Sequence, residues 1–548
     1  FGSSLVQAAC NLWKLRRLRF RILRILMGRC GSKPVSKVDL PTSDDSWWFS
    51  RVSSSKGSKQ SGNSQCTDET CMRAKMVFAN QGRIDQHYSV EPKDLRLFSY
   101  GVVRKGHHLY SNEECMLKKI LRRHGKQMQL ANQEADMMKQ LDHPNILKLF
   151  ETFVTGQSMT LVLECCSGGT LLEKVNKVGH LSESYVSALA RQVFGVVQYL
   201  HMFHKVCHRD LRLENFILSR PNKMEQGVVK LIDFAVAKFI RNGQAMTTKV
   251  GSLHYVSPQM LNGKYDHACD IWSCGVMCCI ALCGYPPFAG ESELEVRANI
   301  KKGGLHFQEK PWQNVSDSAK DLIRTLLTVN CSKRCTVEQA LRHPWIKDRR
   351  LNTGDLILHK GYFDHLRCYA TSSKFKQAAL HIISVHFEED QVSMLRDVFN
   401  AFDEDCDGVI SRKEMVLGIS KAAGDEIPDD LEDLLNSLAG NRSGAIEYTD
   451  FLAAFLEKDF YLEQNACSKA FSIFDRDHDG YICEEDLSYV LHTSSLGDDM
   501  QPEHVGDLLK EYDVNGDEKI DFEEFMLMML KNCSPRREVE DCIGRSRL

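Results

Sequence analysis

The sequence predicts an α+β fold followed by an all-α module, and three observations support this prediction. Strand-like and helical segments succeed one another between about residues 88 and 346. Four loops with helical flanks then recur, with first positions 36, 36 and 38 residues apart (Asp403, Ala439, Asp475 and Asp513). Charge is divided as well: 401–530 has 33 acidic and 9 basic residues, a net of −24, whereas the remaining chain has 40 acidic and 61 basic residues, a net of +21. We therefore expect a cation-holding helical module beside a basic partner.

Composition excludes several classes of protein. A chain of 548 residues is too long for one core, so two to four domains are expected. Hydrophobic content of 43% and charged content of 26% are ordinary for a soluble globular protein. The 21 cysteines show no repeated C-x₂-C spacing, which argues against zinc sites and a disulfide framework. The sequence contains no run of 18 or more apolar residues, so we expect no membrane-spanning helix. We also expect no nucleic-acid partner.

The segment Cys207–Asn215 gives the clearest indication of chemistry. It contains H-R-D-L-x-x-x-N, the pattern of a protein kinase catalytic loop. The carboxylate of Asp210 can accept the proton of an attacking hydroxyl group. Five residues later, the amide oxygen of Asn215 can hold a Mg²⁺ ion that neutralises phosphate charge. One short loop therefore brings a base and a metal ligand together.

Further motifs of the same kind stand on both sides of this loop. Lys118 occupies the position of the strand lysine that holds the α- and β-phosphates of ATP, and Glu134, in an apolar-periodic helix, is its expected partner. Residues 162–164 resemble the hinge that hydrogen-bonds adenine, with Leu163 as gatekeeper and Glu164 at its end. Asp233 opens a D-F-A sequence where D-F-G is usual, which predicts a second Mg²⁺ ligand.

The four recurrent loops match the twelve-residue calcium loop of EF-hands. Each has isoleucine at position 8, where paired loops form a short β-bridge. Carboxylate, hydroxyl and backbone oxygens at alternating positions are the ligands that Ca²⁺ prefers. The candidate ligands are Asp403, Asp405, Asp407, Val409, Ser411 and Glu414 in the first loop, Asp475, Asp477, Asp479, Tyr481, Cys483 and Asp486 in the third, and Asp513, Asn515, Asp517, Lys519, Asp521 and Glu524 in the fourth.

The loops differ in their expected affinity. The first is complete, whereas the second begins with Ala439 and ends with Asp450, so we expect it to bind little Ca²⁺ and to serve as a structural partner. The third ends with Asp486, one methylene shorter than glutamate, which weakens bidentate chelation. The fourth has Glu518 in place of glycine at position 6, and a left-handed non-glycine residue costs about 1 kcal/mol.

The N-terminal region contains an acylation pattern. Residues 27–32 read M-G-R-C-G-S, which predicts myristoylation of Gly28 and palmitoylation of Cys30 if translation starts at Met27. Residues 1–26 would then be upstream sequence, although their basic and apolar character also suits a transit peptide or a membrane-surface helix. Serine- and glycine-rich sequence follows and reads as a disordered linker up to residue 87. We expect a cytoplasmic protein with membrane association through these acyl groups.

A basic, apolar segment joins the two halves of the chain. Leu366, Phe375, Leu380 and Ile383 recur at helical spacing, with lysines between them, up to Phe387. The pattern predicts one amphipathic helix. Its place before an acidic module favours a calmodulin-target-like role over that of an ordinary surface helix.

In this arrangement the sequence resembles the calcium-dependent protein kinases of plants and protists. The resemblance covers about 88–532 and implies a bilobal kinase fold followed by a calmodulin-like pair of EF-hand lobes. It also implies a serine/threonine kinase that uses Mg²⁺ and ATP on protein substrates, and a junction helix that blocks the substrate cleft until Ca²⁺ makes the EF-hand lobes hold it. The implied domains are the kinase at 88–346, the junction at 347–387, EF-hand lobes at 388–458 and 459–532, and a tail at 533–548.

Several residues depart from the family pattern on the nucleotide side. The glycine-rich loop retains Gly101 and Val103 but has Arg96 and Phe98 at two glycine positions. In addition, Met116 replaces a small residue over adenine, Arg212 replaces a catalytic-loop lysine, Thr170 replaces an acid that helps to select basic substrates, and Gln259 replaces the glutamate that pairs with Arg334. These departures leave an alternative open, a catalytically weak or inactive calcium-responsive scaffold. Thr247, Thr248 and Ser252 are candidate phosphorylation sites in the activation segment.

Overall fold

The structure is a computed structural model. It describes residues 77–98, 101–121, 125–221, 227–241, 243–307, 310–347, 361–387, 389–423, 434, 445–462, 464–493 and 502–531. The predicted acylation sites Gly28 and Cys30 lie outside these ranges, as do Ala439 and the start of the second calcium loop. Within them, no helix is both long enough and apolar enough to cross a membrane.

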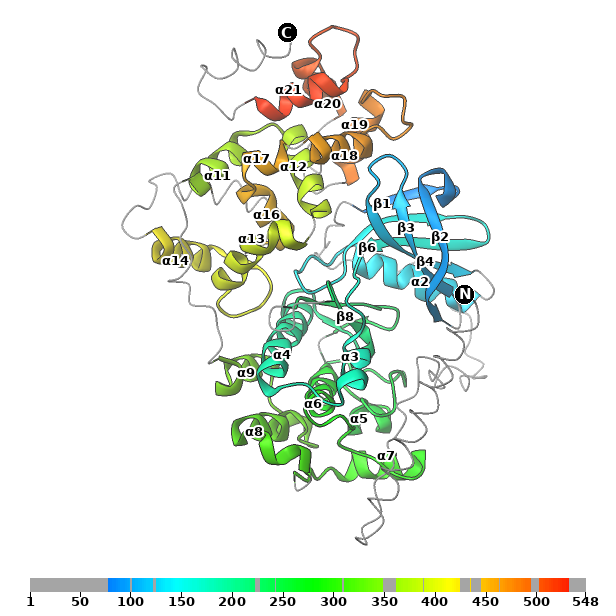
Figure 1. Cartoon of the computed structure of the whole chain (residues 1–548), viewed down its shortest axis with the longest axis vertical. Helices are drawn as coiled ribbons and strands as arrows, with labels where there is room; N and C mark the ends of the chain where they lie inside the picture. Colours follow the sequence, from blue (N-terminus) through cyan, green and yellow to red (C-terminus); the bar gives the residue numbers. More distant parts are fainter. Residues whose placement is uncertain are drawn as a thin grey trace, which may run out of the picture. The chain divides into compact units, whose positions relative to one another are not determined.

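A six-stranded sheet forms the first lobe, with strand order β1-β5-β6-β4-β3-β2 (Figure 1). The strands are β1 (Phe78–Gln81), β2 (Tyr88–Phe98), β3 (Gly101–His108), β4 (Glu114–Leu121), β5 (Leu149–Val154) and β6 (Ser158–Glu164). All neighbours are antiparallel except β1 and β5. Helix α2 (Gly125–Met138) packs against the central strands β4, β5 and β6. The sheet thereby fixes the position of this helix beside β4.

Strand β1 differs from the sequence prediction. The predicted disordered linker ran to residue 87, but Phe78–Gln81 pairs in parallel with β5, and Phe78 lies opposite Glu151. The Phe78 side chain is buried and packs into the core of the EF-hand module, where it stacks on Tyr489 with 6.3 Å between ring centroids. The linker is therefore shorter than predicted, because four residues gain a strand partner and an apolar contact at the sheet edge.

Glu151, on β5, makes the stability of this sheet pH-dependent. Burial raises the pKa of Glu151 to about 7. A carboxyl group with a higher pKa in the folded state binds more protons when folded, so the free energy of unfolding should fall by about 1–3 kcal/mol between pH 4.5 and 7. We expect Glu151→Gln to remove this decline and to raise the melting temperature at pH 8. Thermal unfolding at several pH values checks this, with Glu91→Gln as the control, since the Glu91 side chain on β2 is 41% exposed and lies 3.4 Å from His107. Equal pH slopes in all three proteins would contradict the expectation.

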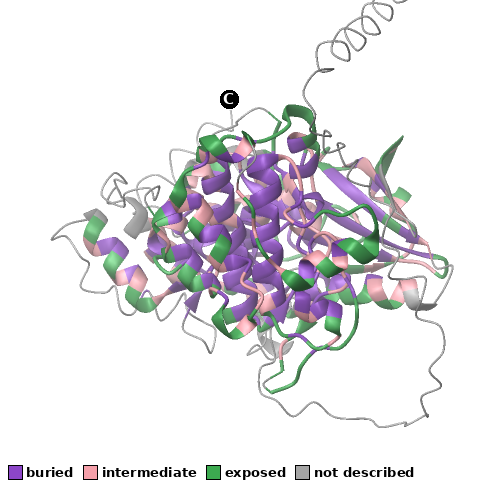
Figure 2. Ribbon diagram, turned by 90° about the horizontal axis from the view of Figure 1, so that it is seen from below, coloured by how far each residue is buried: buried purple, intermediate pink, exposed green. Residues whose placement is uncertain are grey.

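The second lobe is mainly helical. Its helices are α3 (Leu171–Val178), α4 (Glu183–Gln198), α5 (Pro258–Asn262), α6 (Ala268–Cys283), α7 (Glu293–Lys302), α8 (Asp317–Leu326), α9 (Val337–Arg342) and α10 (Pro344–Lys347). Every residue of α6 after Ala268 is buried, as expected of a helix that is apolar on all sides. Buried residues line these packed helices in Figure 2. Helix α6 thus forms the core of this lobe and supports its functional loops.

Four short strands frame the catalytic loop in this lobe. They are β7 (Val206–Cys207), β8 (Phe216–Leu218), β9 (Val229–Leu231) and β10 (Lys238–Phe239). Strand β7 pairs with β10, and β8 pairs with β9, both antiparallel. The catalytic loop is therefore held at both of its ends, and so is the segment that contains Asp233.

The C-terminal module consists of helix–loop–helix units. Its helices are α13 (Glu389–Phe402), α14 (Arg412–Ala423), α16 (Tyr448–Phe455), α17 (Lys458–Tyr461), α18 (Gln464–Phe474), α19 (Glu484–Thr493), α20 (Pro502–Tyr512) and α21 (Phe522–Leu530). The predicted β-bridges between loops are confirmed: Ile410 pairs with Ile446 in strands β11 (Ile410–Ser411) and β12 (Ala445–Ile446), and Ile482 pairs with Ile520.

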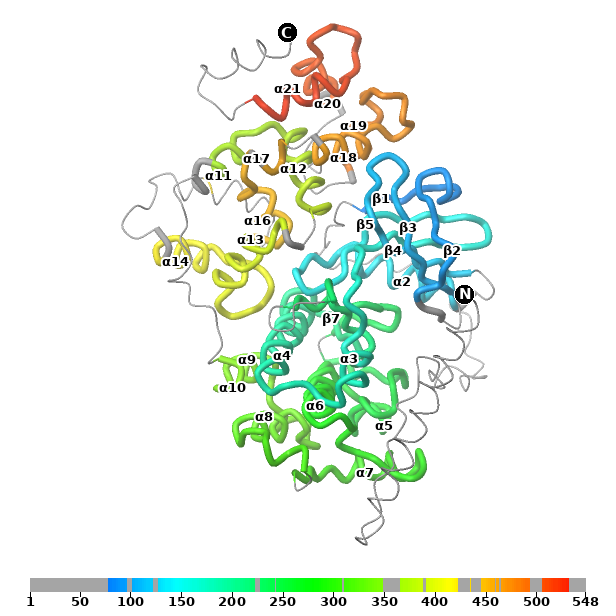
Figure 3. Tube along the Cα trace, viewed as in Figure 1, coloured from blue at the N-terminus to red at the C-terminus, as the bar shows by residue number. Residues whose placement is uncertain are grey.

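The junction forms two helices, so the prediction of one amphipathic helix is wrong. These are α11 (Gly361–Thr371) and α12 (Lys374–His386), and the break falls where the Ser373 hydroxyl accepts the N–H of Lys376 and caps α12. Helix α12 contacts α16, α18 and α19 (Figure 3). Ten of its residues are buried, including Phe375 and Lys376. The junction is therefore a core element of the EF-hand module.

Lys376, one of the two lysines at the start of α12, is buried and does not contribute to a basic surface. It is 1% exposed, and its ammonium group donates to the backbone oxygens of Met529 and Lys531, at 2.6 Å each. These carbonyls lie at the C-terminal end of α21, where a cation is favoured by unpaired carbonyl groups and by the helix dipole. Lys376, which the sequence predicts on a basic face, instead caps the C-terminal end of α21, the last helix of the module.

Candidate active site and calcium loops

The strand lysine and the helix glutamate meet inside the sheet lobe. Lys118 Nζ lies 2.6 and 2.8 Å from the two carboxylate oxygens of Glu134. Both side chains are almost fully buried, at 5% and 3% exposure. Burial raises the pKa of Glu134, and the ammonium group of Lys118 opposes this rise. The predicted pairing is present, and it fixes the ammonium group between β4 and α2.

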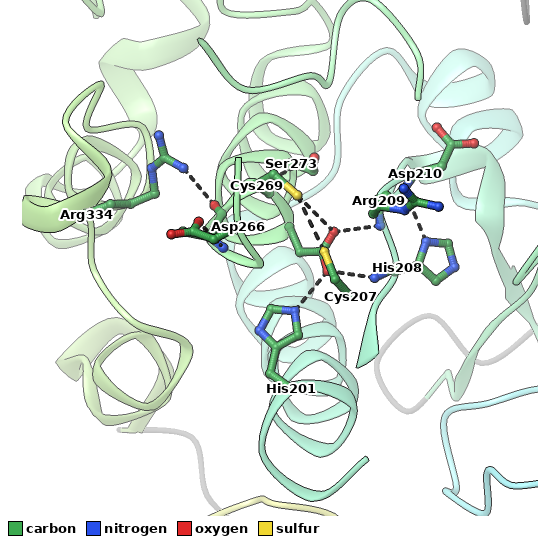
Figure 4. A network of polar contacts seen from close by, with 11 residues as sticks. His201, Cys207, His208, Arg209, Asp210, Asp266, Cys269, Ser273 and Arg334 are labelled. Atoms are coloured by element: carbon green, nitrogen blue, oxygen red, sulfur yellow. Dashed lines mark hydrogen bonds and ion pairs between the residues drawn. The ribbon is translucent and has the colours of Figure 1, made fainter. Parts of the chain in front are cut away.

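The catalytic loop is held by a carboxylate at the start of α6. Asp270 accepts the backbone N–H groups of His208 and Arg209 at 2.8 Å each, and the Nε2 atom of His201 lies 2.8 Å from Asp270 Oδ2 (Figure 4). Burial opposes ionisation of Asp270, but its hydrogen bond with His201 and the nearby positive groups lower its pKa to about 2. The ionised carboxylate therefore fixes the loop, in which Arg209 has a φ of 71°.

Asp210, the candidate base, lies in a network of polar groups. The hydroxyl group of Ser252 donates to Asp210 Oδ1 at 3.2 Å, and the Asn215 amide donates to the Asp210 backbone oxygen at 2.9 Å. Burial raises the pKa of Asp210 to about 6, although the nearby guanidinium of Arg212 opposes this rise. The group is thus mostly ionised at neutral pH and available to accept a proton.

Sequence reasoning missed the position of Ser252. It treated this residue as a phosphorylation candidate, whereas its hydroxyl group contacts the base. The preceding Gly251 has a φ of 91°, and a Cβ there would lie 2.9 Å from the backbone oxygen of Arg209. The glycine therefore allows the activation segment to pass close to the catalytic loop. A Gly-Ser pair before Tyr255 was the signal that could have identified this contact.

Arg212 and Glu214 form an ion pair beside the base. Arg212 Nη2 lies 2.8 Å from Glu214 Oε1, and the side chains are 13% and 12% exposed. Arg212 also donates a hydrogen bond to the Ser252 hydroxyl group, and Tyr255 donates to Glu214 at 3.1 Å. The arginine thus reaches the hydroxyl group next to Asp210, while the charge of Glu214 is compensated inside the lobe.

The second candidate Mg²⁺ ligand lies close to the catalytic loop. Asp233 has a φ of 70°, and its carboxylate accepts the N–H of Ala235 at 3.3 Å. The N–H of Ile232 donates to the backbone oxygen of Asn215 at 2.9 Å, which holds the two candidate ligands on adjacent segments. Phe234, which precedes Ala235, is fully buried, and its ring centroid lies 5.1 Å from that of His208.

On the nucleotide side, β2 and β3 form an antiparallel hairpin up to the retained glycine, and their register shifts between Val90 and Asp94 and again between Asp94 and Arg96. Val103, on β3, lies opposite Arg96 of β2 and opposite Lys118 of β4. Gly101 pairs with Phe98, and a Cβ at Gly101 would lie 2.3 Å from the backbone oxygen of Lys119. This glycine is therefore required by the sheet itself.

The hinge begins at the end of β6. Leu163, the candidate gatekeeper, pairs with Met116 of β4, and both residues are buried. The Glu164 carboxylate accepts the backbone N–H of Lys148 at 3.2 Å and lies 3.1 Å from Lys230 Nζ. Its side chain thus has a structural role, which leaves hinge backbone groups as the candidate partners for adenine.

Gln259, which stands where the family has glutamate, contacts Arg334 in the structure. Arg334 Nη2 donates to the Gln259 amide oxygen at 2.9 Å, so a neutral hydrogen bond replaces an ion pair. Arg334 also donates to the backbone oxygen of Ala268 at 2.7 Å (Figure 4). Its guanidinium group lies over the Trp272 ring, 5.1 Å from the ring centroid. These contacts keep the arginine fixed against α6.

The first calcium loop has the chemistry of a hard-cation site. Carboxylate oxygens of Asp403, Asp405 and Glu414 lie within 4.8 Å of one another. Burial and then neighbouring carboxylates raise the pKa of Asp403, and they raise that of Asp407 to about 7. Gly408 supplies the left-handed turn, with a φ of 84°. These carboxylate oxygens repel one another, and a bound divalent cation would relieve the repulsion. The cluster therefore fits Ca²⁺.

The third calcium loop brings together a smaller set of its candidate ligands. The carboxylates of Asp475, Asp477 and Asp479 lie within 4.8 Å of one another, whereas Asp486 accepts the backbone N–H of Cys483 at 3.2 Å instead of joining them. Lys519, from the fourth loop, lies 2.9 Å from Asp479. The shorter last ligand and this competing cation both favour a weaker site than the first loop.

The second loop is described only in its second half. Its last candidate ligand, Asp450, lies in the first turn of α16 with its Oδ1 atom 3.4 Å from Nε2 of His381, on α12. This contact is consistent with the structural role that the sequence predicts for the loop.

The fourth loop carries the expected backbone strain. Glu518 has a φ of 64°, in the left-handed region, and its N–H donates to Asp513 Oδ2 at 2.9 Å. We expect Glu518→Gly to relieve about 1 kcal/mol of strain and to tighten Ca²⁺ binding at this loop by about fivefold. Calorimetric Ca²⁺ titration checks this, with Glu523→Gly, in the first turn of α21 but outside the loop turn, as the control. Equal affinities of the Glu518→Gly variant and the parent chain would contradict it.

Comparison with known proteins agrees with this geometry. The protein kinase domain pattern matches residues 99–346, and the EF-hand domain pair pattern matches 373–456 and 464–530. Calcium-dependent protein kinase 3 of Plasmodium berghei is 35% identical over 462 residues, which is 83% of this chain and 82% of the relative. Calcium-dependent protein kinase 5 of Plasmodium falciparum is 34% identical over 84% of this chain and 81% of the relative, and calcium-dependent protein kinase 16 of rice is 33% identical over 82% and 81%.

The chain therefore belongs to the calcium-dependent protein kinase family and is a calcium-regulated serine/threonine protein kinase. The alternative of an inactive scaffold is not favoured, since the charged groups of the site are assembled despite the changes in the glycine-rich loop.

Proposed function

We propose that this kinase transfers the γ-phosphoryl group of ATP to protein hydroxyl groups when Ca²⁺ occupies the EF-hand module. Asp210 orients the substrate hydroxyl group and accepts its proton, and Arg212 lies beside the reacting group. Lys118, fixed by Glu134, binds the phosphates of ATP. Asn215 and Asp233 would hold Mg²⁺, which supplies charge neutralisation for the phosphates.

The observation that supports regulation of the kinase by Ca²⁺ is the burial of α12 in the EF-hand module. Phe375 lies among Phe474, Tyr512 and Phe525, with centroid distances of 5.1, 6.2 and 5.9 Å. Ca²⁺ binding opens EF-hand lobes and exposes such apolar grooves. A module without Ca²⁺ would release α12, which is then free to block the substrate cleft.

The module also contacts the kinase lobes while it holds α12. Thr449, at the start of α16, donates from its N–H and its hydroxyl group to the carboxylate of Asp142 at 2.8 and 2.7 Å. His386, at the end of α12, lies 3.1 Å from Glu113. Shifting such a two-state switch from mostly off to mostly on requires about 5.5 kcal/mol of differential Ca²⁺ binding, which two or three good loops can supply.

Phosphate incorporation into a hydroxyl-containing peptide, measured with Ca²⁺ or with a chelator, tests this function. We expect transfer with Ca²⁺ and little transfer with the chelator. A matched variant, Glu414→Gln, removes one Ca²⁺-chelating charge from the first loop and should shift activation to higher Ca²⁺. Equal activity in both conditions, or none in either, would overturn the proposal.

We also propose a cytoplasmic protein that binds membranes through acyl groups on Gly28 and Cys30. The support is the sequence pattern at 27–32 alone. Two acyl chains would anchor the protein stably, whereas one gives marginal binding. Intact mass spectrometry of the native N-terminus tests this: a mature chain that begins upstream of Gly28 excludes the anchor.

A further inference from the structure

The guanidinium group of Arg212 binds two different partners at once, which a lysine at this position could not do. Its Nη2 atom lies 2.8 Å from Glu214 Oε1, and its Nη1 atom donates to the Ser252 hydroxyl group beside the base. Both members of the ion pair are largely buried, so water and salt screen their attraction only weakly. A lysine has one nitrogen and would have to choose between the two partners. The arginine therefore engages Glu214 in addition to the group next to Asp210.

Glu214 is an acidic side chain of the catalytic loop that lies close to where a protein substrate must bind. A chain of direct contacts through Arg212 and Ser252 connects it to Asp210. An extended peptide advances about 3.3–3.6 Å per residue, so residues two or three positions from the acceptor hydroxyl group reach the surroundings of Glu214. Its second carboxylate oxygen accepts the hydroxyl group of Tyr255 at 3.1 Å. Both oxygens thus have partners inside the lobe, and a basic substrate side chain would have to displace one of them.

Thr170 provides no negative charge next to this loop. It forms a β-bridge with Ile217, three residues after Glu214, which places it beside the end of the catalytic loop. Its hydroxyl group accepts the N–H of Glu173 at 3.2 Å, and the Glu173 carboxylate accepts the N–H of Thr170 at 3.0 Å. The hydroxyl group and the carboxylate of this capping box are therefore both bound to the start of α3.

The activation segment adds only positive charge to this side of the lobe. Residues 234–265 contain no aspartate or glutamate, and they include the basic residues Lys238, Arg241, Lys249 and Lys264. Burial lowers the pKa of His254, in the same segment, although Glu214 opposes this effect, so the imidazole is neutral at pH 7. Such a charge distribution attracts acidic segments of a partner and repels basic ones.

We propose that Arg212 determines substrate specificity by binding Glu214, so that the enzyme selects neutral or acidic protein segments over basic ones. This inference rests on the proposed kinase function and names the substrate class of that site. Without Arg212, the Glu214 carboxylate would attract a basic side chain near the acceptor hydroxyl group, whereas the ion pair presents no net charge. The basic activation segment then favours an acidic residue in the substrate. Arg212 thus acts on specificity through Glu214, separately from its place beside the base.

Steady-state phosphorylation of serine peptides by the full chain, at saturating Ca²⁺ and Mg²⁺–ATP, tests the proposal. The peptides carry arginine, alanine or glutamate in turn at each of the three positions on either side of the serine. For the parent chain, we expect kcat/KM for each arginine peptide to stay within about twofold of its alanine counterpart or below it. At one or more positions, the glutamate peptide should exceed the arginine peptide by about threefold to tenfold. The difference should lie in KM, because flanking residues make the same contacts before and during transfer.

The decisive variant is Arg212→Lys, which keeps a positive charge beside Ser252 but releases Glu214. Its ratio of kcat/KM for arginine and alanine peptides should rise by about fivefold to tenfold at one or more positions. This ratio is independent of any change in the absolute rate. Glu214→Gln should remove the gain in the Arg212→Lys background and leave the ratios of the parent chain within about twofold. Arg297→Lys, on α7, where Arg297 pairs with Glu293 at 4.0 Å, is the matched control and should leave every ratio unchanged.

A second variant approaches the same specificity from the other side of the loop. Thr170→Asp adds a carboxylate while it keeps a residue that caps the start of α3 well. It should raise kcat/KM for arginine peptides relative to alanine peptides by about threefold to tenfold, without any change at Arg212.

Two results would overturn the specificity alone. One is a parent chain that prefers arginine peptides and loses this preference on Glu214→Gln, because Glu214 would then already bind the substrate. The other is an Arg212→Lys chain whose ratios equal those of the parent. In both cases transfer occurs with the wrong selectivity. Transfer to no peptide by any form of the chain is a different result, and it would overturn the proposed function together with the specificity.

Discussion

Replacement of Asp210 with asparagine is expected to lower the rate of phosphoryl transfer by about 10²–10⁴-fold, because the amide cannot accept the substrate proton. Asparagine preserves the size of the side chain and can still contact Ser252 and Asn215, so the structure of the loop should persist. Initial rates at saturating Ca²⁺ and ATP measure the effect.

The control is Asp317→Asn, which changes a fully exposed carboxylate in the first turn of α8. It should leave the rate within about twofold of the parent. The Ca²⁺-induced shift in melting temperature should be the same in both variants, since neither residue touches the EF-hand module. An Asp210→Asn chain that keeps its activity would falsify the assignment of the base.

The Phe375→Ala substitution should have the largest effect on regulation. The ring is fully buried in the module, and truncation of a buried phenylalanine typically costs about 3–5 kcal/mol. The module should unfold at lower denaturant concentration. The ratio of activity with Ca²⁺ to activity with a chelator should also fall toward one, because the module no longer holds α12 tightly.

Urea unfolding and the activity ratio test this expectation in the same preparation. Lys374→Ala is the matched control, since this neighbouring side chain is exposed and its ammonium group donates to the Gln377 amide oxygen at 3.2 Å. The control should retain both stability and Ca²⁺ dependence. If both variants keep the same Ca²⁺ response, the contact of α12 with the module does not control the enzyme.

The catalytic arrangement could be predicted from sequence because its residues stand at fixed spacing in short motifs. The contacts of Lys118 with Glu134 and of Arg334 with Gln259 follow from such motifs, as do the paired isoleucines of the calcium loops. Each requires only that a motif adopts its usual local geometry.

Other features depend on partners that no local pattern reveals. Strand β1 has four residues and exists because β5 offers an edge and the EF-hand core accepts Phe78. Ser252 reaches Asp210 only after the activation segment folds back over the catalytic loop. The break in the junction had a local signal, since Ser373 is a good N-cap residue, but the apolar periodicity on both sides suggested one continuous helix.

The buried ammonium group of Lys376 also bears on how the chain is made. Its acceptors at Met529 and Lys531 lie 153 and 155 residues further along the chain. At about 5–20 residues per second, the ribosome needs roughly 10–30 s to reach them after it has added Lys376. During this interval the kinase lobes are complete, but the two backbone oxygens that accept from Lys376 have not yet been synthesised. The buried contact of α12 with the end of α21 can therefore form only when synthesis is nearly finished, and a chain that stops before Met529 would lack both of these carbonyl acceptors.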